Sequence, residues 1–344
     1  MIVVSLFNGM NTGRQALENV GIKVDRYYSS ELKPYAIELT QYHFPDTIQL
    51  GDVTKWREWD IDWAKVDLIL SGSPCQDLSN AGKKAGIHGK KSSLFFVFIE
   101  ILNHCRSLNP NILFLQENVG SANKLDVGIM SREMGLYPVR INSSLVTAQL
   151  RDRYYWTNIR TKETMFDIVT DIPQPEDRGI MLKDIVEFGF VDTNKSRAIL
   201  ESDERPVTQQ HKAAHRYFNG FQTLVFKDGE TYMRVKEATK IGFVDIANGE
   251  AVDLSYPKSK TRRGRSMIDK SNCLLRNNEY FLFEGNELRY FNKTELCRLQ
   301  GFSDNYCDIL SRNKAASLLG DGWTLPIIEH IFSFINQTKN TRNE

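Results

Sequence analysis

The stretch that decides the fold is residues 2–31, IVVSLFNGMNTGRQALENVGIKVDRYYSSE. Its apolar run at 2–7 predicts a buried strand, the glycines after it predict a turn, and residues 12–19 carry a helical pattern before a second strand at 24–29. Further apolar runs at 66–70 and 112–115 flank a helical stripe at 92–106. Strands that alternate with helices form βαβ units, so we predict an α/β fold with a mostly parallel, doubly wound sheet.

The pattern changes after residue 160. Pro173 and Pro175 mark a break, and the chain to about residue 288 is polar, turn-rich and poor in long helical patterns. Helical patterns return at 292–299 and 327–335, before a polar tail at 338–344 that we expect to be frayed. We therefore predict a smaller, irregular second domain between two parts of the α/β domain.

The composition excludes several classes of protein. The chain has 344 residues, 41% hydrophobic and 25% charged, with a formal net charge of +1. Its N-terminus has no basic lead-in and no long apolar run follows, so neither a signal peptide nor a membrane span is expected. The five cysteines, Cys75, Cys105, Cys273, Cys297 and Cys307, lack metal-ligand spacing, which indicates no metal site and a reducing cytoplasm. If nucleic acid is a partner, a local basic patch must meet its phosphates.

Two segments near the N-terminus suggest a nucleoside site. Gly9 and Gly13 lie in the turn after the first strand, and Glu31 ends the second strand. Such glycines let a ligand approach the backbone, and the acid can accept from ribose hydroxyls. The spacing does not match a pyrophosphate cradle, so a ligand such as S-adenosylmethionine fits better, although the glycines could simply make a tight turn. Asp52 could accept from an adenine amino group or could be a surface cap.

Cys75 stands in a polar loop, SGSPCQDLS, directly after the strand at 66–70. In open α/β sheets ligands bind beyond the carboxyl ends of the strands, so we expect this thiol at the functional rim and not in the core. Lysines at positions 83, 84, 90 and 91 could favour a thiolate or meet phosphates, or could be solvated surface charge.

Glu117 follows the apolar run at 112–115, which would place it on the same rim as Cys75. Alone it could be a strand-end cap. A thiol beside a carboxyl suits cytosine chemistry, because sulfur adds to carbon 6 only when a hydrogen-bonding carboxyl at N3 makes the ring electrophilic. Residues 149–153, QLRDR, read as one strand with Gln149, Arg151 and Arg153 on one face, where the arginines would contact phosphate or a base carbonyl unless they are merely exposed.

Taken in order, the motifs resemble the DNA cytosine-5 methyltransferase family. They are FNG at 7–9, PCQ at 74–76, ENV at 117–119, QLRDR at 149–153, ELCRLQGF at 295–302 and GDGWTLP at 320–326. The context GSPCQDLS and Trp323 are most similar to the animal de novo branch, although the chain has the size of a compact bacterial or phage enzyme. It departs from the family at Asn11-Thr12, at Ser303 and in the last motif.

The resemblance implies a Rossmann-like S-adenosylmethionine-dependent methyltransferase domain at 1–164, completed by 291–337, and a target-recognition domain at 165–290. It implies Cys75 as nucleophile, Glu117 as the N3 partner, and Arg153 with Arg151 holding the base, which is flipped out of the duplex. The residues expected to bind the cofactor are Phe7, Gly9, Met10, Thr12, Glu31, Leu32, Asp52, Val53, Pro74 and Trp323.

The expected partner is double-stranded DNA, with a cognate restriction endonuclease as a candidate second partner. The sequence KSKTRRGR at 258–265 is the expected contact with the DNA backbone, although it could be a flexible charged loop. Its basic residues are Lys258, Lys260, Arg262, Arg263 and Arg265. Two alternatives remain open: a relative that methylates transfer RNA, and a catalytically silent DNA-binding protein on the same fold.

Overall fold

The chain forms two compact units. A computed structural model describes residues 1–74, 94–185, 187, 195–196, 233–236, 240–246, 251–253, 265–267, 270–272, 281–284 and 287–335. The first unit contains 1–142, 152–175 and the chain from 325 onward, and the second contains 143–151 and 176–324. These boundaries differ from those expected from sequence, because Gln149 and Arg151 hydrogen-bond with residues 299–322 and so hold both segments in the second unit.

The first unit is built on a seven-stranded sheet with the order β3-β2-β1-β4-β5-β8-β6. Strands β1 to β5 pair in parallel, and β8 runs antiparallel to both β5 and β6, so the predicted mostly parallel α/β sheet is confirmed. The strands are β1 (Ile2–Leu6), β2 (Arg26–Ser30), β3 (Ile48–Gln49), β4 (Leu68–Ser71), β5 (Leu113–Val119), β6 (Val139–Asn142) and β8 (Asp152–Thr157), with a separate hairpin of β9 (Thr161–Glu163) and β10 (Ile168–Thr170).

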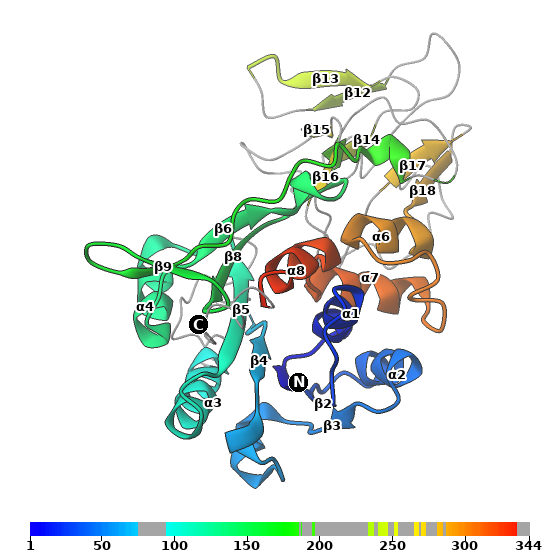
Figure 1. Cartoon of the computed structure of the whole chain (residues 1–344). Helices are drawn as coiled ribbons and strands as arrows, with labels where there is room; N and C mark the ends of the chain where they lie inside the picture. The colour runs from blue at the N-terminus through cyan, green and yellow to red at the C-terminus, as the bar shows by residue number, and fades with distance from the viewer. Residues whose placement is uncertain are drawn as a thin grey trace. The chain divides into compact units, whose positions relative to one another are not determined.

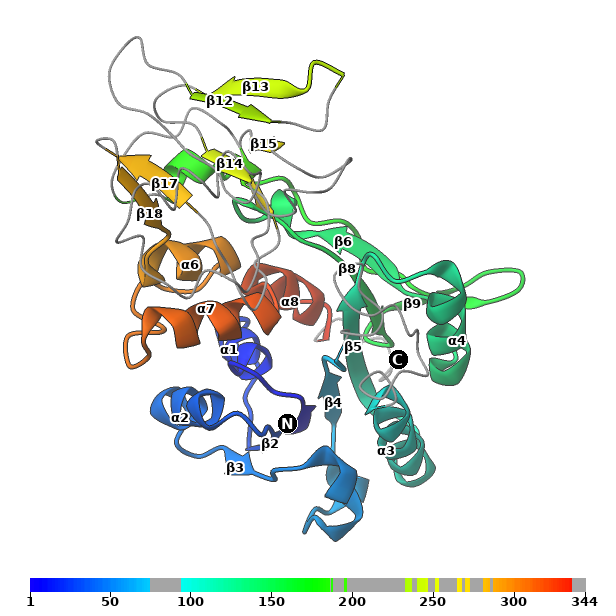
Figure 2. The same ribbon diagram turned by 180° about the vertical axis from the view of Figure 1, so that it is seen from behind.

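Helices cover both faces of this sheet. The helices are α1 (Thr12–Asn19), α2 (Pro34–His43), α3 (Leu94–Leu108), α4 (Lys124–Met134) and α8 (Leu325–Phe332), with the 3₁₀ helices η1 (Val53–Glu58) and η2 (Trp63–Lys65). In both views α3 and α4 lie on one side of β4 and β5, and α1 and α8 lie on the other (Figures 1 and 2). The α3 side buries Phe98, Phe114 and Trp156 completely. Because both faces are covered, only the strand ends remain for a site.

Two strands differ from the sequence-based expectation. β5 continues to Val119 because antiparallel β8 pairs along it, with Val119 opposite Arg153. Glu117 therefore lies inside β5 and does not follow it. The prediction of one continuous strand at 149–153 was wrong, since β7 (Gln149–Leu150) ends before Arg151 and belongs to the second unit, whereas β8 begins at Asp152 in the first.

In the residues of the second unit that the structure describes, short strands are combined with the helices α6 and α7. β7, β11 (Lys195–Ser196) and β16 (Lys270–Asn272) pair in parallel. Three antiparallel pairs join β12 (Met233–Lys236) to β13 (Phe243–Ile246), β14 (Ala251–Asp253) to β15 (Arg265–Met267), and β17 (Phe281–Glu284) to β18 (Glu287–Tyr290). The other elements are η3 (Ser143–Leu145), η4 (Leu182–Asp184), α6 (Lys293–Gln300) and α7 (Arg312–Asp321).

Local sequence explains where α6 begins and ends. Asn292 accepts from the Glu295 backbone N–H, and the Glu295 side chain accepts from the Asn292 backbone N–H, which makes a capping box. Gly301 ends the helix in the left-handed conformation, with φ of 78°. α7 was not predicted from sequence, although Ser311 caps it in the ordinary way.

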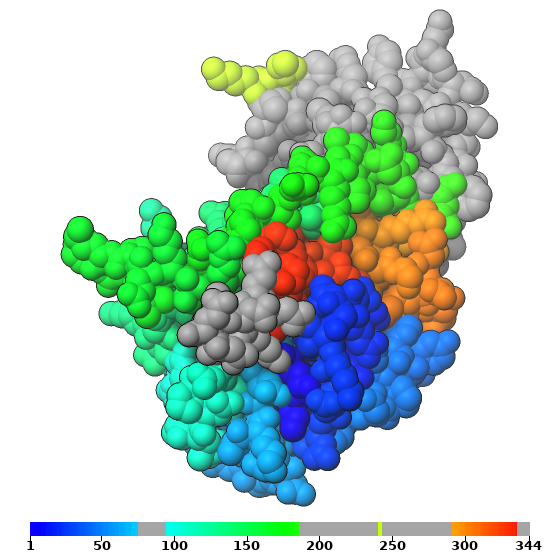
Figure 3. Space-filling view, viewed as in Figure 1, coloured from blue at the N-terminus to red at the C-terminus, as the bar shows by residue number. Residues whose placement is uncertain are grey.

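The surface of the first unit has one projecting hairpin. The loop between β9 and β10, coloured green, stands out from the unit (Figure 3). At its tip Met165 is 88% exposed and Phe166 is 87% exposed. Within the part of the chain that the structure describes, no helix has both the length and the apolarity needed to cross a bilayer.

Candidate active site

The rim of the first unit is where β4 and β5 end side by side. Past β4 the chain runs through Ser73 and Pro74 to Cys75, which lies outside the described residues, as do the four lysines at 83–91. The Gln116 side chain donates from Nε2 to Ser73 Oγ at 2.9 Å, and both side chains are buried. The segment that leads to Cys75 therefore starts against the residue that precedes Glu117.

Glu117 forms an ion pair with Arg153 across the antiparallel strands β5 and β8. Arg153 Nε lies 2.8 Å from Glu117 Oε1, and the two side chains are 11% and 10% exposed. The Arg153 guanidinium also donates to the Asp152 carbonyl at 2.8 Å. This pair places a carboxylate and a five-donor cation together, partly desolvated, at the carboxyl end of the sheet.

Arg151 has a different environment. It is 2% exposed, and its guanidinium donates to the carbonyl of Gly320 at 3.1 Å and to that of Gly322 at 2.6 Å. These two carbonyls belong to the last turn of α7 and to the residue after it, inside the second unit. Of the two arginines expected to hold the base, Arg153 is the one with an ion pair to Glu117 in the described structure.

The loop between β1 and α1 has an unusual backbone. Phe7, Gly9 and Asn11 have positive φ values of 56°, 58° and 65°. Left-handed conformations cost energy for residues other than glycine, so their adoption by both Phe7 and Asn11 within five residues indicates a loop shaped for a purpose other than stability. Met10 and Thr12, both expected at the cofactor, are buried in this loop.

Glu31 ties the end of β2 to this loop. Its Oε2 accepts from the Gly9 N–H at 2.8 Å, and its Oε1 accepts from the backbone N–H groups of Leu32 and Lys33 at 2.8 and 2.9 Å. A carboxylate has about four lone-pair sites, so Glu31 keeps acceptor capacity for hydroxyl groups. Leu32 is 66% exposed, which leaves an apolar side chain available beside the acid.

Asp52 is the N-cap of η1. Its Oδ1 accepts from the Thr54 backbone N–H at 2.9 Å and from the Thr54 hydroxyl at 2.8 Å. These bonds lower the pKa of Asp52, so the carboxylate is ionised at neutral pH. Asp52 can therefore cap η1 through Oδ1 and still offer Oδ2 as an acceptor to an adenine amino group, so the two interpretations from sequence are compatible. Val53, next to it, is buried in the core.

Other expected site residues lie in the second unit or outside the described chain. Trp323 is half-buried in the second unit, between Gly322 and the buried Thr324. The basic stretch at 258–265 lies outside the described residues except for Arg265, whose backbone belongs to β15. The structure therefore brings together Glu117 and Arg153, and separately Gly9 and Glu31.

Sequence reasoning missed three buried polar residues near these segments. Gln116 supports Ser73, Gln300 sits in a hydrogen-bonded network of the second unit, and Asn11 is fully buried with neither amide atom hydrogen-bonded in the described structure. Gln116 directly precedes the motif at 117–119 and Gln300 lies within the motif at 295–302, so a polar residue at a position expected to be buried was the available signal.

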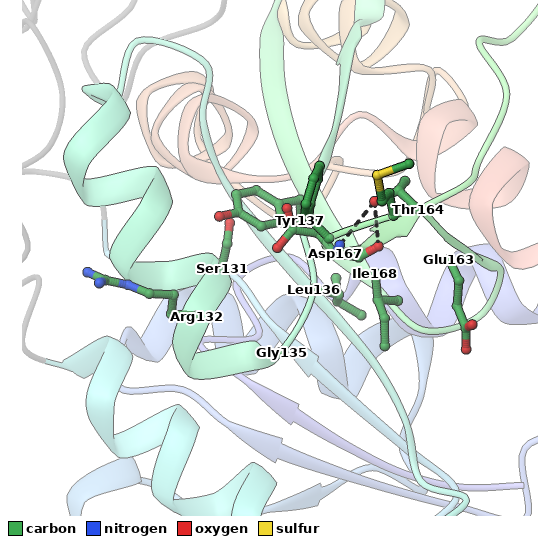
Figure 4. A pocket seen from close by; sticks show the side chains of 11 residues that line it. Ser131, Arg132, Gly135, Leu136, Tyr137, Glu163, Thr164, Asp167 and Ile168 are labelled. Atoms are coloured by element: carbon green, nitrogen blue, oxygen red, sulfur yellow. Dashed lines mark hydrogen bonds between the residues drawn. The ribbon is translucent and has the colours of Figure 1, made fainter.

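A hollow of about 460 Å³ lies elsewhere in the first unit, between the end of α4 and the β9–β10 loop. Figure 4 shows Tyr137 and Ser131 on its α4 side and Thr164 and Asp167, joined by hydrogen bonds, on its hairpin side. None of the residues expected at the active site lines it. This hollow is therefore separate from the rim that carries Glu117.

The sheet order, with helices on both faces, defines a Rossmann-like α/β protein, and its family match places it in the methyltransferase class. The chain belongs to the C-5 cytosine-specific DNA methylase family, whose pattern matches residues 1–337. The resemblance inferred from the ordered motifs is thus confirmed.

Three relatives in bacteria are type II methyltransferases. M.HpaII of Haemophilus parainfluenzae is 26% identical over 339 residues, which is 95% of this chain and 86% of that protein. M.NgoPII of Neisseria gonorrhoeae is 25% identical over 352 residues, or 98% and 96% of the two chains. M.NgoBV of the same species is 35% identical, but over 103 residues that span 29% of this chain and 24% of the relative.

Solved structures show the same fold at low identity. The Dnmt2 methyltransferase of S. pombe superposes with a TM-score of 0.58 at 16% identity and covers 99% of both chains. A putative DNA modification methyltransferase encoded within an E. coli prophage has a TM-score of 0.55 at 16% identity, again over 99% of both chains. The predicted fold class is confirmed by these likenesses.

Proposed function

We propose that the protein transfers a methyl group from S-adenosylmethionine to carbon 5 of cytosine in double-stranded DNA. The observation that supports this best is the partly desolvated pair of Glu117 and Arg153 at the end of β5, beside the strand that leads to Cys75. Membership of the cytosine-specific family over residues 1–337 supports the same substrate.

The proposed reaction begins when the Cys75 thiolate forms a bond to carbon 6 of the base. Glu117 holds a proton at N3, so the electron pair displaced from the 5,6 double bond becomes available at carbon 5. Bound S-adenosylmethionine supplies the methyl group that carbon 5 takes. Loss of the proton from carbon 5 then restores the double bond and expels the Cys75 sulfur. Carbon 6 is shielded within a base stack, so the cytosine must first be flipped out of the duplex.

The other cysteines whose surroundings the structure describes are better suited to a structural role than to that of the nucleophile. Cys105, Cys297 and Cys307 are all fully buried. Burial raises the pKa of Cys105 to about 12, and the pKa of Cys307 is raised by its hydrogen bond with Cys297 and by burial. A thiol with a raised pKa is a poor nucleophile at neutral pH, so Cys75, in its polar loop, is a better candidate than Cys105 or Cys307.

Arg153 has two roles in this proposal. Its Nε contact fixes the Glu117 carboxylate, so the acid keeps one orientation toward the base. The guanidinium is a rigid, planar fork of five donors, the geometry suited to a base carbonyl and the nearby backbone. Arg153 would therefore position the acid and hold the target at the same time.

The β1–α1 loop and the ends of β2 and β3 fit the cofactor that this reaction needs. Glu31 retains acceptor capacity for ribose hydroxyls, exposed Leu32 offers an apolar surface to a purine, and Asp52 Oδ2 can accept from an adenine amino group. The positive φ of Gly9 brings its backbone N–H to Glu31, where the methionine part of the ligand could approach closely. The full proposed set adds Phe7, Met10, Thr12, Val53, Pro74 and Trp323.

DNA is the proposed macromolecular partner. The basic residues Lys258, Lys260, Arg262, Arg263 and Arg265 would contact its backbone, within a target-recognition domain proposed for residues 165–290. Several relatives are type II methyltransferases and another, M.SPRI of Bacillus phage SPR, is an orphan methyltransferase, so a cognate restriction endonuclease is a candidate second partner, in the cytoplasm of a bacterial or phage-infected cell.

The test is transfer of a labelled methyl group from S-adenosylmethionine to duplex DNA and, separately, to transfer RNA, followed by nucleoside analysis. We expect labelled 5-methylcytosine from duplex DNA alone. The Cys75→Ser protein should bind the same DNA and transfer nothing. Label found only in transfer RNA would contradict the proposed substrate, and binding without transfer by the unaltered protein would indicate a silent homologue.

A further inference from the structure

The loop after α7 is held by side chains from two other segments of the second unit. Arg151 lies at the end of the 143–151 segment, and its planar guanidinium bridges the carbonyls of Gly320 and Gly322. The last carbonyls of a helix have no partner within the helix, and an arginine fork can satisfy two of them at once. Arg151 therefore fixes the backbone on the N-terminal side of Trp323.

Gln300, the last residue of α6, reaches the same loop. Its Oε1 accepts from Gln149 Nε2 at 3.1 Å and from Thr324 Oγ1 at 2.8 Å. Its Nε2 donates to the carbonyl of Leu319 and, at 3.4 Å, to that of Gly322. An amide has two donors and two acceptor sites, so this fully buried side chain uses its whole hydrogen-bonding capacity.

A third contact holds the loop on the far side of Trp323. Ser143 donates from Oγ to Thr324 Oγ1 at 2.8 Å, and both side chains are completely buried. Gly322, before Trp323, is thus bound through its carbonyl, and Thr324, after it, through its hydroxyl. Trp323 itself stays half-buried, so the network fixes where an accessible indole stands.

Such a network is costly compared with apolar packing. Each buried polar group contributes little net stability when paired and costs about 1–3 kcal/mol when its partner is removed. Buried polar networks favour one arrangement over its alternatives, because every member must be satisfied at once. Five such side chains around one loop indicate that the position of the loop matters for more than stability.

We propose that Arg151 and Gln300 are positioning residues that set Trp323 for cofactor binding. The inference rests on the proposed function, in which Trp323 contacts S-adenosylmethionine. It assigns Arg151 a role away from the target base, through the carbonyls on either side of Asp321. It also gives Gln300 a role that its place in the motif at 295–302 did not suggest.

The test measures binding of S-adenosylhomocysteine to the full-length protein by calorimetry, which needs no catalysis. In the Arg151→Lys protein, the shorter side chain and compact ammonium do not reproduce the planar fork that donates to both carbonyls from separate nitrogens, and we expect binding to weaken by about tenfold. In a Trp323→Ala background, the same substitution should change binding by less than about twofold, because coupled residues are not additive. Gln300→Leu should behave like Arg151→Lys, in both backgrounds.

Arg312→Lys is the matched control. Arg312 also lies in the second unit and donates from Nε to the Phe291 carbonyl at 2.8 Å. The Arg312→Lys substitution should lower the thermal midpoint of unfolding by an amount similar to that of Arg151→Lys and leave the affinity for S-adenosylhomocysteine unchanged. This separates positioning of Trp323 from general stability of the unit.

Two results would overturn the inference: unchanged affinity in a folded Arg151→Lys protein, or an equal loss of affinity with and without Trp323. If the unaltered protein binds no S-adenosylhomocysteine, the proposed function itself is contradicted. This measurement is made first, before any variant. A tenfold loss that disappears in the Trp323→Ala background supports the inference.

Discussion

At the scale of single residues, Glu117 and Arg153 lie 2.8 Å apart with side chains only 10% and 11% exposed. Most of the hydration of both charges is lost there, and each depends on the other for compensation. Removing one partner of such a pair leaves an unpaired charge and is strongly destabilising. The pair therefore stabilises the end of β5. In the proposed mechanism, Glu117 is the catalytic acid and Arg153 keeps it oriented.

We expect Arg153→Ala to lower the single-turnover rate of methyl transfer by about 100-fold or more, since the acid loses its orientation and the base loses a donor. Arg140→Ala is the matched control, because Arg140 pairs with Asp152 on neighbouring strands but the two side chains are 55% and 31% exposed. A pair this exposed contributes little, so the rate should change only slightly. An equal loss of the single-turnover rate in both variants would mean that the rate depends on general stability of the strands and not on Arg153.

Thiol reactivity gives a second expectation. The raised pKa values of Cys105 and Cys307 mean that their thiolates form only at higher pH, so both should resist alkylation at about pH 8. Cys75, in its polar loop, should be alkylated first, and the rate should follow its own ionisation. Peptide mass spectrometry after limited iodoacetamide treatment, with denatured protein as the control, measures this. Native labelling of Cys105 as fast as that of Cys75 would contradict it.

The choice between the two arginines shows where sequence reasoning ended. Glu117 could be identified because it follows an apolar run and completes a motif. Arg151 and Arg153 could not be told apart, because strict alternation places both on one face only if the strand is continuous. The chain leaves the strand geometry between β7 and β8, and that break depends on contacts of Gln149 and Arg151 with residues distant in sequence.

At the scale of elements, α1 approaches the sheet through a glycine. A Cβ on Gly13 would lie 2.4 Å from Leu70 Cδ1 and 3.2 Å from the Tyr27 hydroxyl. The sequence showed Gly13 as part of a turn, whereas in the structure it is a helical residue whose missing side chain permits close packing. The need for glycine here comes from the neighbouring strands and is not visible in the local pattern.

Gly13→Ala and Gly128→Ala should therefore change stability in opposite directions. At Gly13 the new methyl group must displace Leu70, and overpacking of this kind costs about 1–3 kcal/mol. Gly128 lies within α4 with nothing within 4 Å of its added Cβ, so alanine there should stabilise by about 0.5–1 kcal/mol. Urea unfolding of both variants measures the difference. Destabilisation by Gly128→Ala, or none by Gly13→Ala, would contradict this packing.

Element lengths were less predictable than element types. The strands β1 and β4 were recognised because a buried parallel strand is largely a continuous apolar run, whereas the two-residue β3 was not predicted. β5 was predicted too short, because its last residues, including Gln116 and Glu117, are polar and stay in the strand only through pairing with β8. α7 was missed because its sequence, RNKAASLLGD, has a short and weak apolar stripe.

At the scale of the whole molecule, the division into units crosses the expected domain boundaries. Residues 291–324, which were expected to complete the catalytic domain, fall in the second unit, whereas α8 belongs to the first. No local pattern encodes this division, since it depends on which distant segments exchange hydrogen bonds. The bases that are read are likewise set by a few side chains and do not follow from the sequence.

Binding to DNA should depend on the basic stretch at 258–265. We expect replacement of its five basic residues by alanine to weaken binding and to reduce the salt slope by about 0.9 for each phosphate that the protein no longer neutralises. Titration of one duplex at several salt concentrations measures the slope. Replacement of the exposed lysine Lys23, in the first unit, is the control. An unchanged slope would remove the stretch from the DNA interface.

The central claim is that Cys75 bonds to carbon 6 of a cytosine while carbon 5 is methylated. Its most direct measurement uses a duplex in which 5-fluorocytosine replaces the target cytosine, identified beforehand by bisulfite sequencing of DNA from cells that express the protein. Fluorine cannot leave as the proton does, so the sulfur should stay bonded to the base, and mass spectrometry should find a methylated adduct on Cys75. Absence of any adduct during turnover, or an adduct on another cysteine, would contradict the account.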